Sequence, residues 1–283
     1  MNIGLVLEGG GLRGCYTAGV LTWLIDQGIE ADTVVGISSG AMLGSYYMLK
    51  DKNALHEIGV TYASDPKNIG LQPLLHEGTP VGYRFLFETV LKKILHYDYR
   101  ELQAVTRTFE FGVYSLKLQK TIWKNQHTMD NELKYMLAAC TLPLAGRSVK
   151  IDGVKYLDGG ITTMVPIGHA EELGASKFLV VVTKDPDFVR KPNGRVTQFL
   201  LDLLYFNYKK LLKDFRARTQ VYYDEMNHVR DLQGKGQAIL LQPTRDCGVK
   251  HFSGTREQME IMFDLAKEDC ENRKDEILAF FAK

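Results

Sequence analysis

The first fifty residues alternate short apolar runs with longer amphipathic segments. An apolar run at 3–9 ends in glycines and predicts a buried parallel strand, because strands covered on both faces are continuously apolar. Residues 14–28 carry apolar side chains at helical spacing and end in glycine, which predicts a helix. A second apolar run, 32–38, and a second helical segment, 39–50, repeat this order. Two successive strand–helix units predict an α/β fold with a mostly parallel sheet and right-handed crossovers.

The rest of the chain predicts one domain spanning 1–283, with a variable excursion at about 51–105 and a helical C-terminal region from about 197. Asp152-Gly153, between two segments of alternating apolar and polar residues, is a strong signal for a hairpin turn. Asp130 precedes a helical pattern and is a candidate N-cap. The expected elements are a helix at 85–95, two strands within 107–125, a helix at 130–140, a hairpin at 148–160, a helix and a strand within 166–184, a long helix at 197–227, a strand at 237–244 and a helix at 255–283.

Composition and charge narrow the function classes. The net charge of +1 gives no overall field that would attract nucleic acid, so we expect no nucleic-acid partner. The beginning of the chain shows no basic and apolar leader, and no apolar run approaches the ~20 residues that span a bilayer. The four cysteines are far apart in the sequence, which predicts reduced thiols rather than disulfides. The chain shows no metal-ligand motif, so we expect no metal. We therefore expect a cytoplasmic protein whose membrane contact, if present, is peripheral.

The glycine turn after the first strand permits two interpretations. Gly9, Gly11 and Gly14 form the G-x-G-x-x-G pattern of dinucleotide-binding turns. Such sites need an acidic residue at the end of the second strand, where it binds ribose hydroxyls. The acidic candidates, Glu30 and Asp32, precede that strand instead. We therefore expect no nicotinamide or flavin cofactor, and a dinucleotide-binding oxidoreductase is the weaker alternative.

The second strand ends in a different motif, "GISSG", in which Gly36, Ser38 and Gly40 form G-x-S-x-G. A serine on a sharp strand-to-helix turn has its hydroxyl exposed above the sheet, and the glycines permit the turn. Both glycine-bearing turns follow parallel strands, so both are expected at the carboxyl edge of the sheet. Ser38 is thus a candidate nucleophile.

The glycine turn can then stabilise an oxyanion beside this serine. Backbone amides at Gly10 and Gly11 have no side chains in the way, and Arg13 adds a positive charge. The base is expected to be Asp158, which follows a strand in "LDGG", whereas Asp152 belongs to the hairpin turn. The histidines at 169, 228 and 251 lie in no motif and are interpreted as surface or structural residues.

These segments together resemble bacterial members of the patatin-like phospholipase family. The shared motifs are "EGGGLRG", "GISSG" and "LDGG", with "AACTLPL" and "PIGHAEELG" as supporting segments, and the resemblance is clearest over 3–50 and 136–183. It implies a three-layer α/β/α sandwich with a central mostly parallel sheet. It also implies a hydrolase of acyl esters, often of lipids, that needs no cofactor.

Carried over by position, the resemblance makes Ser38 and Asp158 a catalytic dyad and assigns the oxyanion hole to Gly9, Gly10 and Gly11 with Arg13 nearby. Two small departures are Ser39, where alanine is common, and Glu8, where aspartate is common in plant members. An ordinary α/β-hydrolase is less consistent with the chain, because its serine follows several strands and its triad requires a histidine.

Two alternatives stay open from the sequence. The chain could be a catalytically weak lipid-binding protein of the same fold. The sequence does not determine the head group or acyl chain of its ligand, nor the oligomeric state of the protein. The helical segment 197–227 has apolar residues at helical spacing with Lys209, Lys210 and Lys213 alongside. It could pack on the core with a solvated basic face, or it could form a peripheral lipid-contacting surface.

Overall fold

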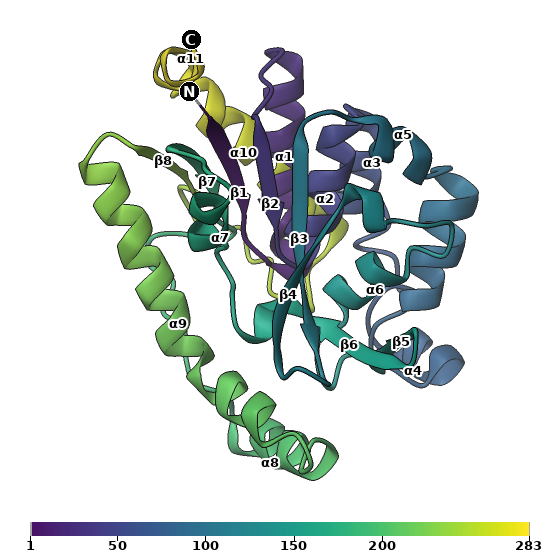
Figure 1. The fold of residues 1–283 in the computed structure, drawn as a ribbon. Coiled ribbons are helices and arrows are strands. Elements are labelled where there is room, and N and C mark those ends of the chain that lie inside the picture. The colour runs from purple at the N-terminus through teal and green to yellow at the C-terminus, as the bar shows by residue number, and fades with distance from the viewer. Residues whose placement is uncertain (1, 283) are drawn as a thin grey trace.

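The computed structural model describes residues 2–282 and builds them around one mixed sheet of eight strands (Figure 1). The order is β5-β6-β3-β2-β1-β7-β8, with β4 also paired to β3. The five strands from β3 to β8 are parallel, and β4, β5 and β6 add antiparallel pairs. Their bounds are β1 Ile3–Leu7, β2 Thr33–Gly36, β3 Thr108–Ser115, β4 Lys120–Asn125, β5 Val149–Ile151, β6 Val154–Asp158, β7 Lys177–Val181 and β8 Ala238–Leu241.

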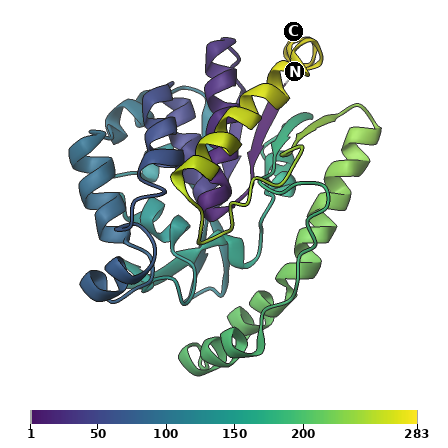
Figure 2. The ribbon, with the colours of Figure 1, turned by 180° about the vertical axis from the view of Figure 1, so that it is seen from behind.

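Helices cover both faces of this sheet. One face carries α1 (Gly14–Asp26), α2 (Ser39–Met48) and α10 (Arg256–Glu271), and α10 lies along α1 (Figure 2). The other face carries α7 (Ile167–Glu172) and α9 (Lys209–Gly234). Side chains alternate between the layers, so Leu5 and Leu7 belong to one core cluster and Val6 to the other. The expected three-layer α/β/α sandwich is confirmed.

The segment at 51–105 is an excursion made of short helices beside α2. The helix expected at 85–95 is present, but its hydrogen bonds have the wider π spacing. The bounds are α3 Lys52–His56, a π-helix at Glu57–Thr61, α4 Leu71–Glu77, a π-helix at Phe85–Ile94 and α5 Tyr99–Ala104.

Both long C-terminal helices are interrupted, which corrects the two unbroken helices expected from the sequence. The first is divided into α8 (Arg195–Leu204) and α9, because Leu201 and Phe215 are buried in the same small cluster and a straight helix could not place both there. The second is divided into α10 and α11 (Lys274–Phe281), and at the break Arg273 donates to the backbone oxygen of Leu240 at 2.6 Å.

The start of α6 (Lys134–Cys140) was also predicted wrongly. Asp130 does not cap this helix; its carboxylate accepts the Glu132 N–H at 2.9 Å in the preceding turn. The N-cap position is Leu133, which adopts a left-handed φ of 54°. The hairpin turn is as expected, with Asp152 and Gly153 both at positive φ. Single-turn 3₁₀ helices at Gly11–Arg13, Gln126–Thr128 and Gly159–Ile161 complete the elements.

We expect the close contact of α1 with α10 to make Gly19→Ala destabilising. A Cβ at Gly19 would lie 2.2 Å from the Phe263 oxygen and 2.7 Å from the Ala266 Cβ, so the helices must separate. The free energy of unfolding, measured by urea titration, should fall by about 3 kcal/mol. The control is Gly168→Ala on α7, where a Cβ meets nothing within 4 Å and helix propensity favours alanine. A Gly19→Ala protein as stable as the wild type would contradict this packing.

Candidate active site

Ser38 occupies a strained turn between β2 and α2. Its φ of 54° and ψ of −125° are unusual for a residue with a side chain and cost on the order of 1–3 kcal/mol. The flanking glycines have no room for a Cβ. At Gly40 a Cβ would lie 2.6 Å from the Leu7 oxygen, and at Gly36 it would lie 2.6 Å from the Gly40 oxygen. The close approach of α2 to β1 therefore holds the serine where the sheet ends.

The glycine turn after β1 is fixed by the buried carboxylate of Glu8. This carboxylate accepts the Thr183 N–H at 2.7 Å and the Thr183 hydroxyl at 2.9 Å, and it pairs with the Lys184 ammonium group. A Cβ at Gly10 would lie 2.6 Å from the Thr183 hydroxyl oxygen. The turn is thus fastened to the segment that follows β7, and glycine is required for this approach.

The three amides of the turn are in different states. The Gly9 N–H donates to the Met164 oxygen at 3.3 Å, and the Gly10 N–H donates to the Ser39 hydroxyl at 3.0 Å. Within residues 2–282, the Gly11 N–H has no acceptor. Gly11 has a φ of 58°, and a Cβ there would lie 2.4 Å from the His251 oxygen. Of the three amides, that of Gly11 is therefore the most available to a ligand.

Asp158 is fully buried at the end of β6. Its Oδ1 accepts the Gly160 N–H at 2.7 Å, whereas Oδ2 has no hydrogen-bond partner within the described chain. Burial raises the pKa of Asp158 to about 6, and the Gly160 N–H, the Ser38 hydroxyl and the charge of Arg218 oppose this rise. The Ser38 hydroxyl makes no hydrogen bond of good geometry to the carboxylate, yet it lies close enough to favour the ionised form. The structure thus brings the two predicted residues together.

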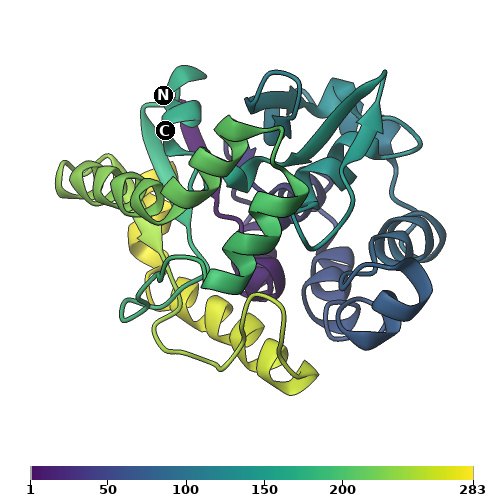
Figure 3. The same cartoon turned by 90° about the horizontal axis from the view of Figure 1, so that it is seen from below.

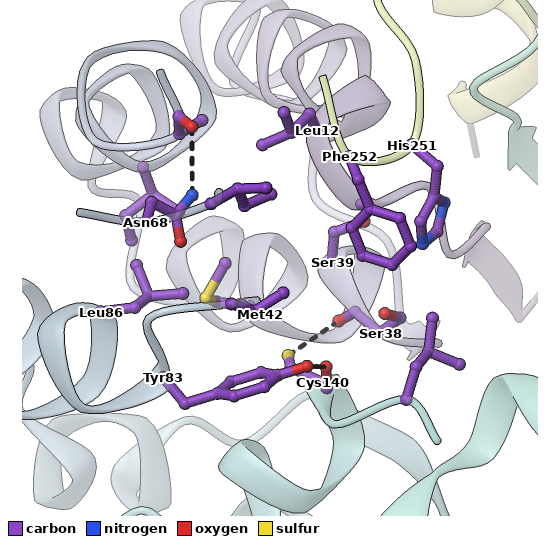
Figure 4. A pocket seen from close by; sticks show the side chains of 16 residues that line it. Leu12, Ser38, Ser39, Met42, Asn68, Tyr83, Leu86, Cys140, His251 and Phe252 are labelled. Atoms are coloured by element: carbon purple, nitrogen blue, oxygen red, sulfur yellow. Dashed lines mark hydrogen bonds between the residues drawn. The ribbon is translucent and has the colours of Figure 1, made fainter. Parts of the chain in front are cut away.

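A narrow apolar cavity of about 90 Å³ opens beside Ser38 (Figure 4). Two hydrogen bonds hold its floor: the Tyr83 hydroxyl donates to the backbone oxygen of Cys140 at 3.0 Å, and the Cys140 thiol donates to the backbone oxygen of Ser38 at 3.5 Å. The excursion helices supply much of the wall. The apolar lining includes Leu12, Met42, Ile58, Ala63, Ile69, Val81, Leu86, Leu142 and Phe252.

A second, wider cavity of about 540 Å³ adjoins the first. Ile69, Leu142, His251 and Phe252 line both. Arg13 lies in this wider cavity, where its Nε donates to the Val249 oxygen at 3.0 Å. The two cavities therefore meet beside the glycine turn and Ser38.

His251 is a site residue that the sequence did not indicate. Its ring and that of Phe252 face Ser38 and Ser39 in Figure 4, and its oxygen accepts the Leu12 N–H at 3.1 Å. Burial, followed by the positive charges nearby, lowers the pKa of His251 to about 3, so the ring is neutral at pH 7. The residues around it form no periodic pattern or motif, so no sequence signal was present to find it.

The other two histidines considered from the sequence, His169 and His228, lie away from Ser38. His169 stacks on Trp123 with 3.8 Å between ring centroids and contacts Glu110 at 2.7 Å, and His228 contacts Glu171 at 2.9 Å. Neither lines the two cavities at Ser38. Within residues 2–282, no group of three or more metal-ligating side chains is assembled, and no helix is long and apolar enough to cross a bilayer.

The fold and this site define a class: α/β/α proteins with a strained serine between a strand and a helix at the edge of a parallel sheet. Comparison with known sequences identifies the family. A sequence model of the patatin-like phospholipases matches residues 5–171, and the chain belongs to that family of lipid acyl hydrolases. A second model, for a domain of unknown function (DUF6363), matches residues 208–282.

Individual relatives are more distant. The uncharacterized protein YjjU of Escherichia coli is 27% identical over 189 residues, which cover 64% of this chain and 52% of YjjU. The human patatin-like phospholipase domain-containing protein 6 is 26% identical over 186 residues, which cover 64% of this chain and 13% of that protein. This chain therefore matches only about half, or less, of these relatives' length. The crystal structure of VipD from Legionella pneumophila superposes with a TM-score of 0.51 at 13% identity, covering 97% of this chain and 67% of VipD, and supports the fold alone.

The raised pKa of Asp158 predicts a pH-dependent stability difference. The folded-state pKa of about 6 exceeds the ordinary value of 3.8, so the folded form binds the proton more strongly. The stabilisation that comes from this stronger proton binding is complete below pH 3.8 and is lost as the pH rises through 6. At pH 7.5 the buried charge costs wild type about 3 kcal/mol, and Asp158→Asn removes this cost. The unfolding free energy of the variant relative to wild type should therefore rise between pH 4 and 7.5.

The measurement is urea unfolding at each pH, with Asp130→Asn as a control that removes an exposed carboxylate instead. A difference between Asp158→Asn and wild type that stays constant with pH would show that Asp158 is not buried as a charge.

Proposed function

We propose that the protein hydrolyses carboxylic esters of lipids, with Ser38 as the nucleophile and Asp158 as its single base. The observation that carries this proposal is the juxtaposition of a strained serine with a buried carboxylate whose Oδ2 has no hydrogen-bond partner within residues 2–282. The family supports acyl-ester hydrolysis in general. The apolar cavity beside Ser38 offers a place for the acyl chain.

The proton inventory favours a dyad over a histidine triad. As Ser38 attacks the acyl carbonyl, its hydroxyl proton passes to Oδ2 of Asp158, which later returns it to the leaving alcohol. Water then attacks the acyl-serine, and the same carboxylate accepts and returns a proton. With a pKa of about 6, Asp158 is ionised at pH 7 and is a stronger base than His251, whose pKa is about 3.

Stabilisation of the oxyanion is assigned to the glycine turn. Gly11 offers the N–H that has no partner in the described chain, and Gly9 and Gly10 shape the turn through the donor bonds that they already make. Such a donor contributes when it is aimed at the charge that develops during the reaction. Arg13 lies in the wider cavity, where its positive charge acts from beside the turn.

Two helices at the rim of the wider cavity expose apolar side chains, and we assign them a role in contacting a lipid surface. Gly70, immediately before α4, and Thr197 on α8 both line the cavity. α9 differs from these two helices, because its apolar side chains are buried in the core. Figure 3 shows the molecule from the end at which α8 lies. The exposed residues are Leu71, Leu74 and Leu75 on α4, and Val196, Phe199, Leu200, Leu203 and Leu204 on α8, with Phe206 following.

This surface accounts for how an aggregated lipid could reach a buried site. Several large apolar side chains exposed on one helix are unusual for a surface in contact with water alone, and their place next to a cavity favours an interfacial partner. The contact would be peripheral and would position the mouth of the wider cavity at the lipid headgroups.

The dyad makes a specific kinetic prediction. Ser38→Ala and Asp158→Asn should each lower kcat for a short-chain aryl ester by at least ~10³-fold, and the double variant should be little worse than either, because the two residues act as a unit. A fluorophosphonate probe should label wild type and fail to label Ser38→Ala. Absence of labelling in folded wild type would favour a catalytically idle lipid-binding protein.

Histidine variants supply the controls for this experiment. His169→Asn and His228→Asn lie outside both cavities and should keep wild-type activity. His251→Asn alters a cavity wall and should lower kcat/KM by less than about 100-fold, the smallest loss expected on removing a general base. A folded His251→Asn protein as inactive as Ser38→Ala would replace the dyad with a triad.

The exposed surface of α8 makes a second prediction. Phe199→Ser combined with Leu203→Ser should reduce co-sedimentation with phosphatidylcholine–phosphatidylglycerol vesicles by about tenfold, because two exposed side chains lose their transfer into lipid. The matched control is Ile261→Ser on α10, which changes a residue that is 45% exposed and does not line the cavity. Wild-type protein that never sediments with vesicles would exclude this role.

A further inference from the structure

The wider cavity has an unusual distribution of charge. Among residues 2–282, five cationic side chains line it and no carboxylate does, although the whole chain is nearly neutral. The cavity also reaches Gly9 and His251, so it is continuous with the reaction site. The cationic residues are Arg13, Lys184, Arg190, Lys191 and Arg218, and they are called the cationic wall below.

This positive charge is only partly neutralised by the protein, since the charge of Asp158, which does not line the cavity, acts on Arg218 and that of Glu8 acts on Arg190. Lys184 is paired with Glu8. Within residues 2–282, none of the other four members has a carboxylate oxygen within 4.0 Å. The nearby Glu225 does not offset them, since burial raises its pKa to about 8 and its carboxyl group is mainly protonated at pH 7. The cavity therefore carries a net positive charge.

Three guanidinium groups of the cationic wall are held in place without using all of their donors. Each lies over an aromatic ring, a cation–π contact that positions the group and uses none of its N–H donors. Arg13 lies 5.2 Å from the Phe188 centroid, Arg190 lies 5.3 Å from that of Tyr222, and Arg218 lies 4.6 Å from that of Phe215.

The positive charges of the cationic wall also repel one another, which disfavours the charged form of each group. Burial, and then the charge of Arg190, lower the pKa of Arg218 to about 10. The same positive charges add to burial in lowering the pKa of His251. A cluster of like charges in a partly buried cavity is relieved when an anion binds, so the cavity is preorganised for a negatively charged ligand.

We propose that the cationic wall binds a phosphate group carried by the substrate, so that the substrate is a phosphate-bearing acyl ester with a net negative head group. The assignment of this ligand as a substrate part rests on the proposed function. Guanidinium groups bind phosphate oxygens through paired N–H donors, and Asn193 and Thr197 line the same cavity as neutral partners for alcohol groups. The acyl chain then enters the apolar cavity, and the ester lies at Ser38 between the two.

The cationic wall depends on chain outside the patatin-like match. Arg13 lies within residues 5–171, whereas Lys184, Arg190 and Lys191 follow it and Arg218 lies within the second matched region. Selection of the head group is therefore a property of this chain's own C-terminal part.

The kinetic test compares two esters with the same acyl chain, 1-acylglycerol 3-phosphate and 1-monoacylglycerol, in neutral detergent micelles. Wild type should favour the phosphate ester by at least tenfold in kcat/KM. Arg190→Gln with Lys191→Gln should reduce this ratio at least tenfold, mainly through KM. Arg218 is left intact because its Nε donates to the Gly160 oxygen next to Asp158. The control, Lys93→Gln with Lys235→Gln, removes two exposed charges elsewhere and should keep the wild-type ratio.

A binding experiment separates the failure of this inference from the failure of the proposed function. By calorimetry, glycerol 3-phosphate should bind wild type more tightly than inorganic phosphate does, and at least tenfold more weakly to Arg190→Gln with Lys191→Gln. Binding without hydrolysis of either ester would retain the phosphate site and reject the hydrolase. Equal hydrolysis of both esters, equal binding of the two phosphates, or binding that is insensitive to the variants would overturn the head-group site.

Discussion

The close approach of α2 to the end of β1 is the constraint on which the site depends. Glycines at 36 and 40 let the backbone of the helix pass so near the strand that Ser38 is forced into a left-handed conformation. Strain of this kind persists only when surrounding packing holds it, and the buried helix α2 and the parallel sheet supply that packing. The serine is thereby held at the sheet edge, close to Asp158.

A second consequence of the fold is that the site is built from distant parts of the chain. The carboxylate of Glu8 fastens the glycine turn to Thr183 and Lys184 after β7, and Arg13 binds the Val249 oxygen. The turn after β1 is thus held by the C-terminal half of the protein. His251 lies beside Gly11 in this arrangement, and the cationic wall lines a cavity that also includes Gly9 and His251.

The two cavities beside Ser38 differ in the chemistry of their walls. Apolar side chains from the excursion at 51–105 line the narrow cavity, and guanidinium and ammonium groups line part of the wide one. An amphiphile has the same division between an apolar chain and a polar head. The exposed faces of α4 and α8 lie next to residues that line the wide cavity, which is the side that we propose contacts lipid.

The sequence by itself determined the parallel sheet, the two glycine-bearing turns and the pairing candidates Ser38 and Asp158, because these follow from local pattern and from the rule that parallel strands end at one edge. It could not determine the breaks before α9 and α11, because burial of Leu201 and the bond from Arg273 depend on elements distant in sequence. The pKa of Asp158, the place of His251 and the cationic wall were decided only by tertiary structure. Burial and the sum of nearby charges are properties of three-dimensional neighbours, and no spacing along the chain encodes them.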